Sequence, residues 1–397
     1  MRLLFVQADA SLAYDNEGNM YVNTNADRAI WERYRKYCDE LTLLMKRDNK
    51  VYTKERACAI FSMFDRSLAE IVSVPTLRSP RRNIFNLKLR AEVYRTISEE
   101  VRRADRIIVR TPGFWLPDTV LKMCRKYGKI YMIEAIDFPS EIFRHSGFML
   151  RRISAPYVEM KCRSEIARAP YVAYVTDHVL QERYPTRGKS VACSDVEIPA
   201  LDDSVLASRL KRMRDTAGGK IIFGTVGGVS KVKGQEYVIR ALSALRSEGV
   251  TGIEYQLVGA GGDWLMRLAE SLGVSGQVKF LGTVPHDEIS AWYDSLDVYI
   301  QPSVTESQCR SVIEAMSRGC PAACSRVGGM QEYPDKDIMF TAKNVKEIAA
   351  IMKKLLDPEE RIRQARKSFD IAKNFERPKL DAVRDKFYAE FMGAGKP

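Results

Sequence analysis

Short runs of apolar residues alternate with longer amphipathic stretches along most of the chain. The short runs are rich in Val, Ile and Leu, which is typical of buried strands, and the longer stretches repeat apolar positions as surface helices do. This alternation predicts parallel sheets covered by helices. In the first half the predicted strands are residues 3–6, 41–45, 71–74, 106–110, 129–133 and 171–175, and the predicted helices lie near 26–38, after 53, near 87–103, after 115 and near 149–168.

The alternation stops after Ile198 and Pro199, where a polar segment begins, and it resumes with a new strand at 221–226. The length supports a division here, since 397 residues exceed the size at which a single core stops growing. The other predicted strands of the second half are residues 255–258, 278–281, 298–300 and 322–325, and its predicted helices lie near 235–245, 264–272, 287–293 and 310–318.

Two domains of this pattern are expected to be α/β and Rossmann-like, with doubly wound parallel sheets that face each other across a cleft. Ligands of such sheets bind beyond the carboxyl ends of the strands, so the loops that follow strands are where chemistry is expected. The predicted segments are an N-terminal domain of residues 1–198, a linker of 199–219, a C-terminal domain of 220–375, and a helix of 376–397 that can return to the first domain.

The net charge of +12 is uneven, because most of the excess of Lys and Arg lies in the first half. The cluster of Arg102, Arg103 and Arg106 predicts an anionic partner, such as an anionic membrane surface or an anionic acceptor, and ordinary solvated helix faces are the alternative. Nucleic-acid binding is not predicted, because no RNP-like, zinc-finger or helix-turn-helix motif accompanies the charge.

The eight cysteines are scattered singly, without a CxxC pair, and only three histidines accompany them. This predicts free thiols in a reducing compartment, with no bound metal and no cofactor. No apolar run reaches the roughly 18 residues that a bilayer-spanning helix needs. We therefore expect a cytoplasmic protein, which its basic first domain can hold at the inner face of the membrane.

Two carboxylates of the second half, Glu306 and Glu314, are the first candidates for chemistry. Glu306 follows the predicted strand 298–300, and Glu314 lies in the helix that comes next. A helical segment of that length would separate them by about 12 Å, whereas the paired carboxylates of glycosidases lie within about 5–10 Å of each other. The spacing therefore argues against a hydrolytic pair. It suits a long ligand such as a nucleotide sugar, with one carboxylate at each end.

The residues between the two glutamates open the predicted helix. Backbone N–H groups at a helix N-terminus attract anions, so this stretch is a candidate for binding a diphosphate. Its residues are Ser307, Gln308, Cys309 and Arg310.

Four other segments accompany the carboxylate pair in a fixed order: Gly227 to Gly234, Leu257 to Gly261, Phe280 to His286, and Gly328 to Glu332. Together they resemble the nucleotide-binding domain of the family 4 retaining glycosyltransferases, which have the GT-B fold. The first half is similar, more loosely, to bacterial exopolysaccharide and cell-surface glycan glycosyltransferases. That similarity rests on Trp31, Tyr34 and Tyr37 and on the stretch from Val175 to Pro185.

The resemblance implies a metal-independent transfer, with retention, from a UDP- or GDP-sugar to a glycan or lipid-linked glycan in polysaccharide synthesis. It implies that Lys233 contacts the donor diphosphate, that Glu306 holds the donor sugar, that Glu314 binds the ribose and that Val284 meets the base through its backbone. Gly227 and Gly228 belong to the same donor loop. The family usually has an arginine at position 228, for which Arg310 or Lys231 can substitute.

In relatives, a histidine or acidic residue of the first domain faces the donor sugar. His145 and Asp137, which follow the fifth predicted strand, are the candidates here, with an ordinary loop position as the alternative for each. Gly18, after the first predicted strand, takes the place of a glycine-rich loop near the diphosphate. His178 and His286 stand at predicted helix starts, which explains them without a catalytic role.

Other functions remain open. A dinucleotide-dependent oxidoreductase is disfavoured, because Trp264 stands where the third glycine of its fingerprint would be after Gly259 and Gly261. A metal-dependent transferase is suggested only by Asp335 and Asp337, which we interpret as a solvated turn. A nucleotide-sugar 2-epimerase of the same fold, or a noncatalytic nucleotide-sugar-binding protein, stays possible.

Overall fold

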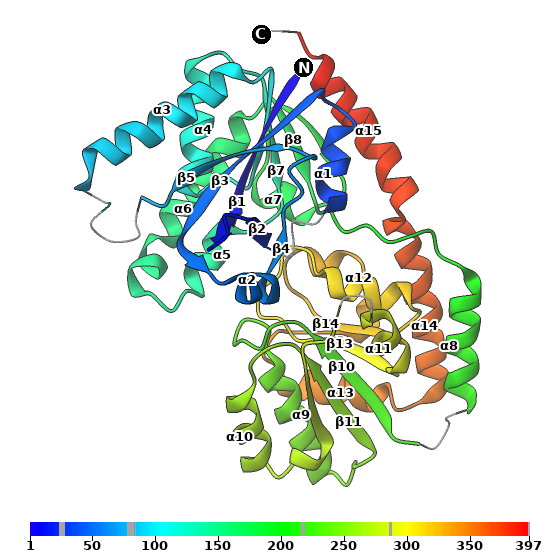
Figure 1. Cartoon of the computed structure of the whole chain (residues 1–397). Coiled ribbons are helices and arrows are strands. Elements are labelled where there is room, and N and C mark those ends of the chain that lie inside the picture. The colour runs from blue at the N-terminus through cyan, green and yellow to red at the C-terminus, as the bar shows by residue number, and fades with distance from the viewer. Residues whose placement is uncertain (24–27, 78–82, 84, 216–218, 286–287, 396–397) are drawn as a thin grey trace. The chain divides into compact units, whose positions relative to one another are not determined.

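The structure is a computed structural model that describes residues 1–397 apart from 24–27, 78–82, 84, 216–218, 286–287 and 396–397. The chain forms two compact units (Figure 1). Unit 1 consists of Met1–Val175, Gln181–Ala192 and Arg384–Pro397, and unit 2 consists of Thr176–Leu180 and Cys193–Val383.

Unit 1 is built on a nine-stranded sheet, most of which is parallel in the order β5-β3-β1-β6-β7-β8-β9. The order reverses between β1 and β6, as a doubly wound sheet requires. Its strands are β1 Arg2–Asp15, β2 Met20–Asn23, β3 Glu40–Tyr52, β4 Phe61–Met63, β5 Glu70–Pro75, β6 Arg106–Arg110, β7 Tyr131–Ala135, β8 Tyr171–Tyr174 and β9 Lys189–Ala192.

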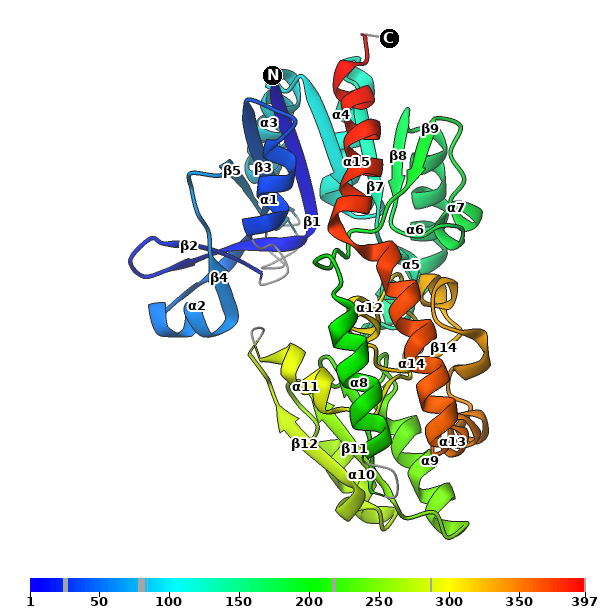
Figure 2. The same ribbon diagram turned by 90° about the vertical axis from the view of Figure 1, so that its right-hand side faces the viewer.

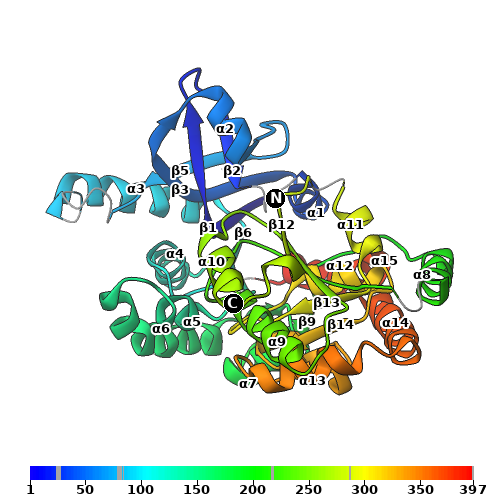
Figure 3. The same cartoon turned by 90° about the horizontal axis from the view of Figure 1, so that it is seen from below.

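The helices of unit 1 follow the predicted alternation, and α5 and α6 lie side by side (Figure 3). Helix α6 spans the residues that its pattern predicts. The helices are α1 Arg28–Arg35, α2 Lys54–Ile60, α3 Leu87–Arg103, α4 Trp115–Lys126, α5 Pro139–Arg144, α6 Met149–Arg168 and α7 Val179–Arg183, which begins in unit 2 and ends in unit 1.

Strand β1 is longer than its apolar run. It continues past Val6 to Asp15 and pairs there with the second half of β3 after a register shift. β2 and β4 then add antiparallel strands, and with α2 they extend to one side of the parallel strands (Figure 2). The prediction missed this extension, because polar residues interrupt the alternation after Val6.

Gly18 consequently lies in the tight turn that joins β1 to β2, where its φ of 82° favours glycine. Asp15 closes the turn by accepting hydrogen bonds from the backbone N–H groups of Glu17 (2.9 Å) and Asn19 (2.8 Å) and from the Tyr21 hydroxyl (2.8 Å). Burial alone would raise the pKa of Asp15, but the hydrogen bonds outweigh it and lower that pKa to about 2. The conformation of this turn is therefore enough to explain why residue 18 is a glycine.

The end of helix α15 (Arg377–Gly393) is part of the core of unit 1. Phe387, Tyr388 and Phe391 pack in the apolar cluster that also holds residues of β1 and β3. Arg106 donates hydrogen bonds to the carbonyl oxygens of Phe391 (3.0 Å) and Met392 (2.8 Å). This part of the predicted basic cluster therefore has a structural role, and the predicted return of the final helix is confirmed.

Unit 2 is built on a six-stranded parallel sheet in the order β12-β11-β10-β13-β14-β15, with the reversal between β10 and β13. The strands match the prediction closely, except that the short β15 was not predicted. They are β10 Ile221–Val226, β11 Ile253–Val258, β12 Val278–Gly282, β13 Val298–Gln301, β14 Ala322–Ser325 and β15 Met339–Phe340.

Helices cover both faces of this sheet, and α8 occupies most of the segment predicted as a linker. Buried Arg209 of α8 donates hydrogen bonds to the carbonyl oxygens of Tyr293 (2.8 Å) and Arg318 (3.1 Å). The helices are α8 Asp203–Asp215, α9 Gln235–Ser247, α10 Asp263–Ser271, α11 Ile289–Ser295, α12 Arg310–Ser317, α13 Val345–Lys354, α14 Pro358–Ala372 and the first part of α15.

Both units have the predicted Rossmann-like α/β class with parallel sheets. None of the helices in the described part of the chain combines the length and the apolar content that crossing a bilayer requires.

Candidate functional site

Two loops meet at the reversal point of the unit 2 sheet. One follows β10 and leads into α9, and the other follows β13 and leads into α12. Because β10 and β13 are neighbours, the carboxyl ends of both strands open at the same place. There the Lys233 ammonium lies 2.7 Å from Oε2 of Glu306, and the Val304 N–H donates a hydrogen bond to the Val232 carbonyl (2.7 Å). The structure thus brings together the predicted diphosphate lysine and the predicted sugar-binding carboxylate.

Glycines allow the loop backbones to come this close. A Cβ on Gly234, whose φ is 71°, would lie 2.1 Å from the carbonyl oxygen of Pro302. A Cβ on Gly259, in the loop after β11, would lie 2.1 Å from the carbonyl oxygen of Gly227. Any larger residue would push the loops apart at these positions. Gly228 differs, because a Cβ there would meet no atom of the described residues within 4 Å.

A chain of hydrogen-bonded side chains from β13 and the loop after it holds Glu306 in place. Oε2 of Glu306 accepts a hydrogen bond from the Ser303 hydroxyl (3.2 Å), which accepts one from the Gln301 amide (2.9 Å). The Tyr299 hydroxyl donates to Oε1 of Gln301 (2.6 Å). Burial raises the pKa of Tyr299 far above its ordinary value, so this hydroxyl keeps its proton at neutral pH.

Glu314 lies in α12 and is half-buried. Its Oε2 accepts a hydrogen bond from the hydroxyl of Tyr293 (3.0 Å), a buried residue of α11. Burial also raises the pKa of Tyr293 well above its ordinary value, so Tyr293 acts as a donor. Its ring contacts that of Tyr299 edge to face, with 5.7 Å between centroids. The tyrosines therefore connect the supports of Glu306 and Glu314.

Two residues at the start of α12 already form hydrogen bonds within unit 2. The Cys309 N–H donates to the Tyr333 hydroxyl (2.9 Å), and Oε1 of Gln308 accepts from the Ser194 hydroxyl (2.7 Å). Burial raises the pKa of the Cys309 thiol to about 11, which keeps it neutral. The Cys309 amide thus already has a partner within the unit, and a role of Cys309 in donor binding stays a prediction. Ser307 is half-buried, and Arg310 is exposed.

The Gly328–Glu332 segment forms a 3-10 turn that packs against the loop between β13 and α12. A Cβ on Gly329 would lie 2.2 Å from the carbonyl oxygen of Ser307, so only glycine allows the close packing. The Glu332 carboxylate accepts backbone hydrogen bonds from Asp177 (2.7 Å), His178 (2.9 Å) and Val179 (2.6 Å). The sequence explains His178 by its place at a helix start. The structure agrees, because Glu332 accepts the backbone N–H groups at the start of α7.

Val284 follows β12 and is half-buried against the apolar cluster that contains Trp292 and Tyr293. His286, at the end of the same motif, lies outside the described residues.

The unit 1 candidates lie at the two ends of α5. Asp137 precedes the helix and is half-buried, whereas His145 is exposed at its C-terminus. Nδ1 of His145 lies 3.0 Å from the carbonyl oxygen of Glu141, which is the position of a helix C-cap. Catalytic roles for Asp137 and His145 and a donor-binding role for Gly18 stay predictions.

Asp335 and Asp337 are paired rather than simply solvated. Asp335 caps a short 3-10 turn by accepting the Asp337 N–H (3.1 Å) and lies 2.5 Å from the Lys367 ammonium. Asp337 lies 3.1 Å from the Arg363 guanidinium. Both carboxylates thus have structural partners.

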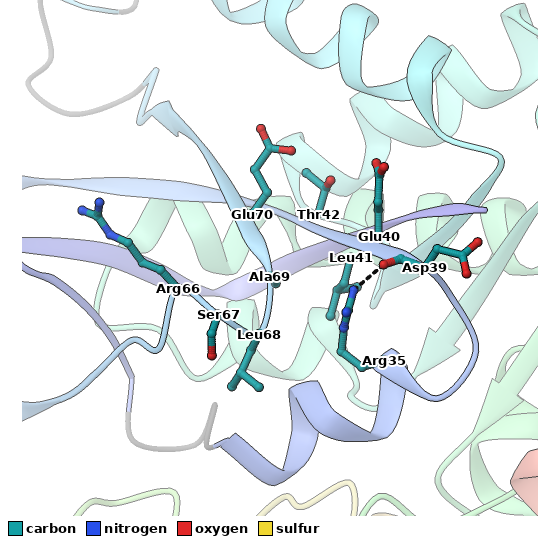
Figure 4. A pocket seen from close by; sticks show the side chains of 10 residues that line it. All are labelled: Arg35, Asp39, Glu40, Leu41, Thr42, Arg66, Ser67, Leu68, Ala69 and Glu70. Carbon is teal, nitrogen blue, oxygen red and sulfur yellow. Dashed lines mark hydrogen bonds between the residues drawn. The ribbon is translucent and has the colours of Figure 1, made fainter.

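Unit 1 also has a hollow of about 230 Å³ beside the amino ends of β3 and β5 (Figure 4). This is the edge of the sheet opposite to the one where ligands of such folds bind. Two of its carboxylates already face the Arg2 guanidinium, Glu40 at 4.0 Å and Glu70 at 3.0 Å. Its lining residues are Arg35, Asp39, Glu40, Leu41, Thr42, Arg66, Ser67, Leu68, Ala69 and Glu70.

Residues 209–370, which include the whole Lys233–Glu306–Glu314 arrangement, match the family described as glycosyl transferases group 1. They are a group 1 glycosyltransferase domain. The chain is 27% identical over 359 residues to Protein CapJ of Staphylococcus aureus, and the match covers 89% of this chain and 85% of CapJ. The family predicted from the sequence, that of the glycosyltransferases, agrees with both matches.

Solved structures share the fold of this chain. Anabaena HepE in complex with UDP-glucose has a TM-score of 0.64 at 16% identity and covers 98% of both chains. WaaG, a glycosyltransferase involved in lipopolysaccharide biosynthesis, has a TM-score of 0.63 at 16% identity and covers 100% of both chains. The predicted GT-B fold is confirmed.

The prediction missed Tyr293, Tyr299, Gln301 and Ser303. A signal for three of them is present, because positions 299, 301 and 303 alternate along a strand and its extension and therefore share one face. Polar side chains on one face of an otherwise apolar strand indicate a buried support. Tyr293 gives no comparable signal, since its helix is amphipathic in the ordinary way.

Proposed function

We propose that this glycosyltransferase moves a sugar, with retention, from a UDP- or GDP-sugar to a glycan or lipid-linked glycan in cell-surface polysaccharide synthesis. The observation that carries the proposal is the Lys233–Glu306 pair at the reversal point of the sheet, 2.7 Å apart, with Glu314 held by Tyr293 in the same unit. HepE, which shares the fold, was solved with UDP-glucose, and WaaG is involved in lipopolysaccharide biosynthesis. We place the reaction on the cytoplasmic side of the membrane.

Lys233 and Glu306 would exchange partners when the donor binds. Before binding, the carboxylate neutralises the ammonium. The donor diphosphate then draws the ammonium to itself, which stabilises the negative charge that grows on the leaving phosphate. Glu306, held by Ser303, is left to accept a hydrogen bond from a sugar hydroxyl.

The proposed chemistry is front-face substitution without a metal. The acceptor oxygen bonds to the anomeric carbon on the side from which the phosphate oxygen departs, and that phosphate oxygen takes the acceptor proton. No protein nucleophile is needed, so the residues mainly position the reactants and stabilise charge.

Tyr293 would position Glu314 for the ribose hydroxyls. Replacing Tyr293 with Phe removes one hydrogen bond of typical net worth, about 0.5–1.5 kcal/mol. We expect KM for the donor to rise about threefold to tenfold, with kcat changed less, because the ribose lies away from the reacting bond. Steady-state rates over a range of donor concentrations measure this. An unchanged KM with a reduced kcat would contradict the assignment.

A substitution at Gly228 that should strengthen donor binding provides a further test. Its backbone does not have the positive φ that favours glycine, and a side chain there would meet open space, so arginine fits without strain. A charge-assisted contact to the diphosphate contributes about 1.5–3 kcal/mol. We therefore expect Gly228→Arg to lower the donor Kd about tenfold or more, measured by calorimetry, while Gly228→Ala leaves it unchanged. Weaker binding by the arginine variant would count against a diphosphate at this loop.

The proposed function is tested directly by thermal shift with a panel of UDP-, GDP- and ADP-sugars, followed by turnover with glycan acceptors. Failure of every donor to stabilise the protein would refute it. Assignment of the product anomer by NMR tests retention. Donor conversion without an acceptor would favour a nucleotide-sugar 2-epimerase, and donor binding without any turnover would favour a noncatalytic binding protein.

A further inference from the structure

Helix α6 of unit 1 carries two apolar stripes on opposite faces. One stripe, with Ala155, Val158, Cys162 and Ile166, is buried. The second stripe is exposed, although an apolar helix face normally packs against a partner. It consists of Met149 (75% exposed), Leu150 (82%), Ile153 (69%), Tyr157 (59%) and Met160 (62%), and the N-cap residue Phe148 (70%) is exposed just before the helix.

The spacing makes these residues one continuous surface. Leu150, Ile153, Tyr157 and Met160 follow one another at intervals of three or four, so they line a single side of the helix. Ile142 of the neighbouring α5 is also exposed. A contiguous apolar surface of this kind marks an interaction site rather than the scattered apolar residues of an ordinary surface.

Cations border the exposed stripe. Helical geometry places Arg152 and Arg163 along one edge. Lys161 lies along the other edge, where its ammonium pairs with Asp118 at 3.2 Å. Arg151 lies over the ring of Phe148, with 5.7 Å between guanidinium carbon and ring centroid. Within the described part of the chain, no carboxylate forms an ion pair with Arg151 or Arg152.

The acidic side chains of α6 are occupied elsewhere. Glu159 is half-buried and lies 2.8 Å from the Arg183 guanidinium, and Glu165 is buried and pairs with Arg125. The exposed side of the helix is therefore apolar in its middle and positive along the edge that carries Arg152 and Arg163.

We propose that this face of α6 docks on an anionic lipid bilayer, with the helix lying along the interface. Large apolar side chains enter the boundary of the acyl chains, tyrosine suits the headgroup level, and arginine meets lipid phosphates. The positive edge and Arg151 select an anionic surface over a neutral one. The inference deepens the proposed function by naming the surface at which a lipid-linked acceptor is met, and for that purpose it rests on the proposed function.

Vesicle co-sedimentation of the full chain, without any nucleotide sugar, tests the proposal. We expect binding to phosphatidylcholine vesicles that contain phosphatidylglycerol, little binding to pure phosphatidylcholine, and weaker binding at high salt. Leu150→Glu with Ile153→Glu should abolish binding. Arg151→Ala with Arg152→Ala should lower the partition coefficient about 25-fold, at about fivefold for each arginine. Met266→Glu, on α10 of unit 2, is the matched control, because Met266 is an exposed apolar helix residue (42%) that does not belong to the stripe.

Unchanged vesicle binding by the double glutamate variant, or equal binding to neutral and anionic vesicles, would overturn the proposal. So would a dimer in gel filtration that the same variant dissociates while vesicles are not bound, because the stripe would then belong to a second copy of the chain. The variants should keep the unfolding temperature and the donor-induced thermal shift of the wild type. Vesicle binding without any donor shift would refute the proposed function and leave this inference standing.

Discussion

Replacing Lys233 with alanine is expected to lower kcat/KM for the nucleotide sugar about 10²–10³-fold. The ammonium is the cation that the structure places on Glu306 at the loop after β10, and it is the group that meets the leaving diphosphate under the proposed function. Removing one preorganised group that stabilises transition-state charge typically costs about 2.7–4 kcal/mol. Initial rates with a saturating acceptor and varied donor measure the loss.

The control for Lys233→Ala is Lys353→Ala. Lys353 also forms an ion pair of 2.7 Å, with Glu248, but both partners are exposed and lie away from the candidate site. Its removal should leave the rate unchanged, because exposed pairs of this kind contribute about 0–1 kcal/mol to stability. A folded Lys233→Ala protein with wild-type kcat/KM would show that this lysine does not meet the donor.

Replacing Glu134 with alanine is expected to lower the free energy of unfolding of unit 1 by about 3–5 kcal/mol. Glu134 is buried at the end of β7, where it pairs with the equally buried Arg110 at 2.8 Å and accepts the Tyr34 hydroxyl at 2.8 Å. The hydroxyl of Tyr388 donates to the same carboxylate. Its removal leaves a buried guanidinium without its carboxylate and both hydroxyls without this acceptor. Urea unfolding followed by tryptophan fluorescence, with Trp31 and Trp115 in unit 1, measures the change.

Two comparisons make the Glu134 experiment decisive. Glu99→Ala, at an exposed position of α3, should change the free energy of unfolding by no more than about 0.5 kcal/mol. Tyr388→Phe removes only one hydrogen bond and should cost about 1 kcal/mol, which keeps the test informative if Glu134→Ala does not fold. Equal stabilities of Glu134→Ala and Glu99→Ala would mean that the buried cluster contributes nothing.

The sequence predicts most of the fold where burial is continuous. The strands at 221–226 and 322–325 have the bounds that the sequence predicts, because a strand buried on both faces is largely free of charged and bulky polar residues. The paired loops could also be predicted, since glycines and a lysine after one strand and a glutamate after its neighbour appear directly in the sequence.

The remainder depends on contacts that no local pattern contains. The extension of β1 to Asp15 is held by pairing with the distant second half of β3, so its own polar residues give no strand signal. The support of Glu314 by Tyr293 joins two helices that strand β13 separates in the sequence. The engagement of the Cys309 amide depends in the same way on Tyr333. Hydrogen bonds between residues far apart in the sequence therefore determine which of the predicted groups already have a partner within the protein.

The contribution of residues 384–393 to unit 1 affects how the protein is made. Phe387, Tyr388 and Phe391 pack against strands that begin at Arg2, so a core assembled around the first strand needs side chains translated almost four hundred codons later. A nascent chain that has emerged only as far as unit 2 lacks these rings, so the apolar side chains against which they pack stay uncovered. Unit 1 therefore cannot complete its core during elongation, and chaperones have an apolar target on it until residue 391 has left the ribosome.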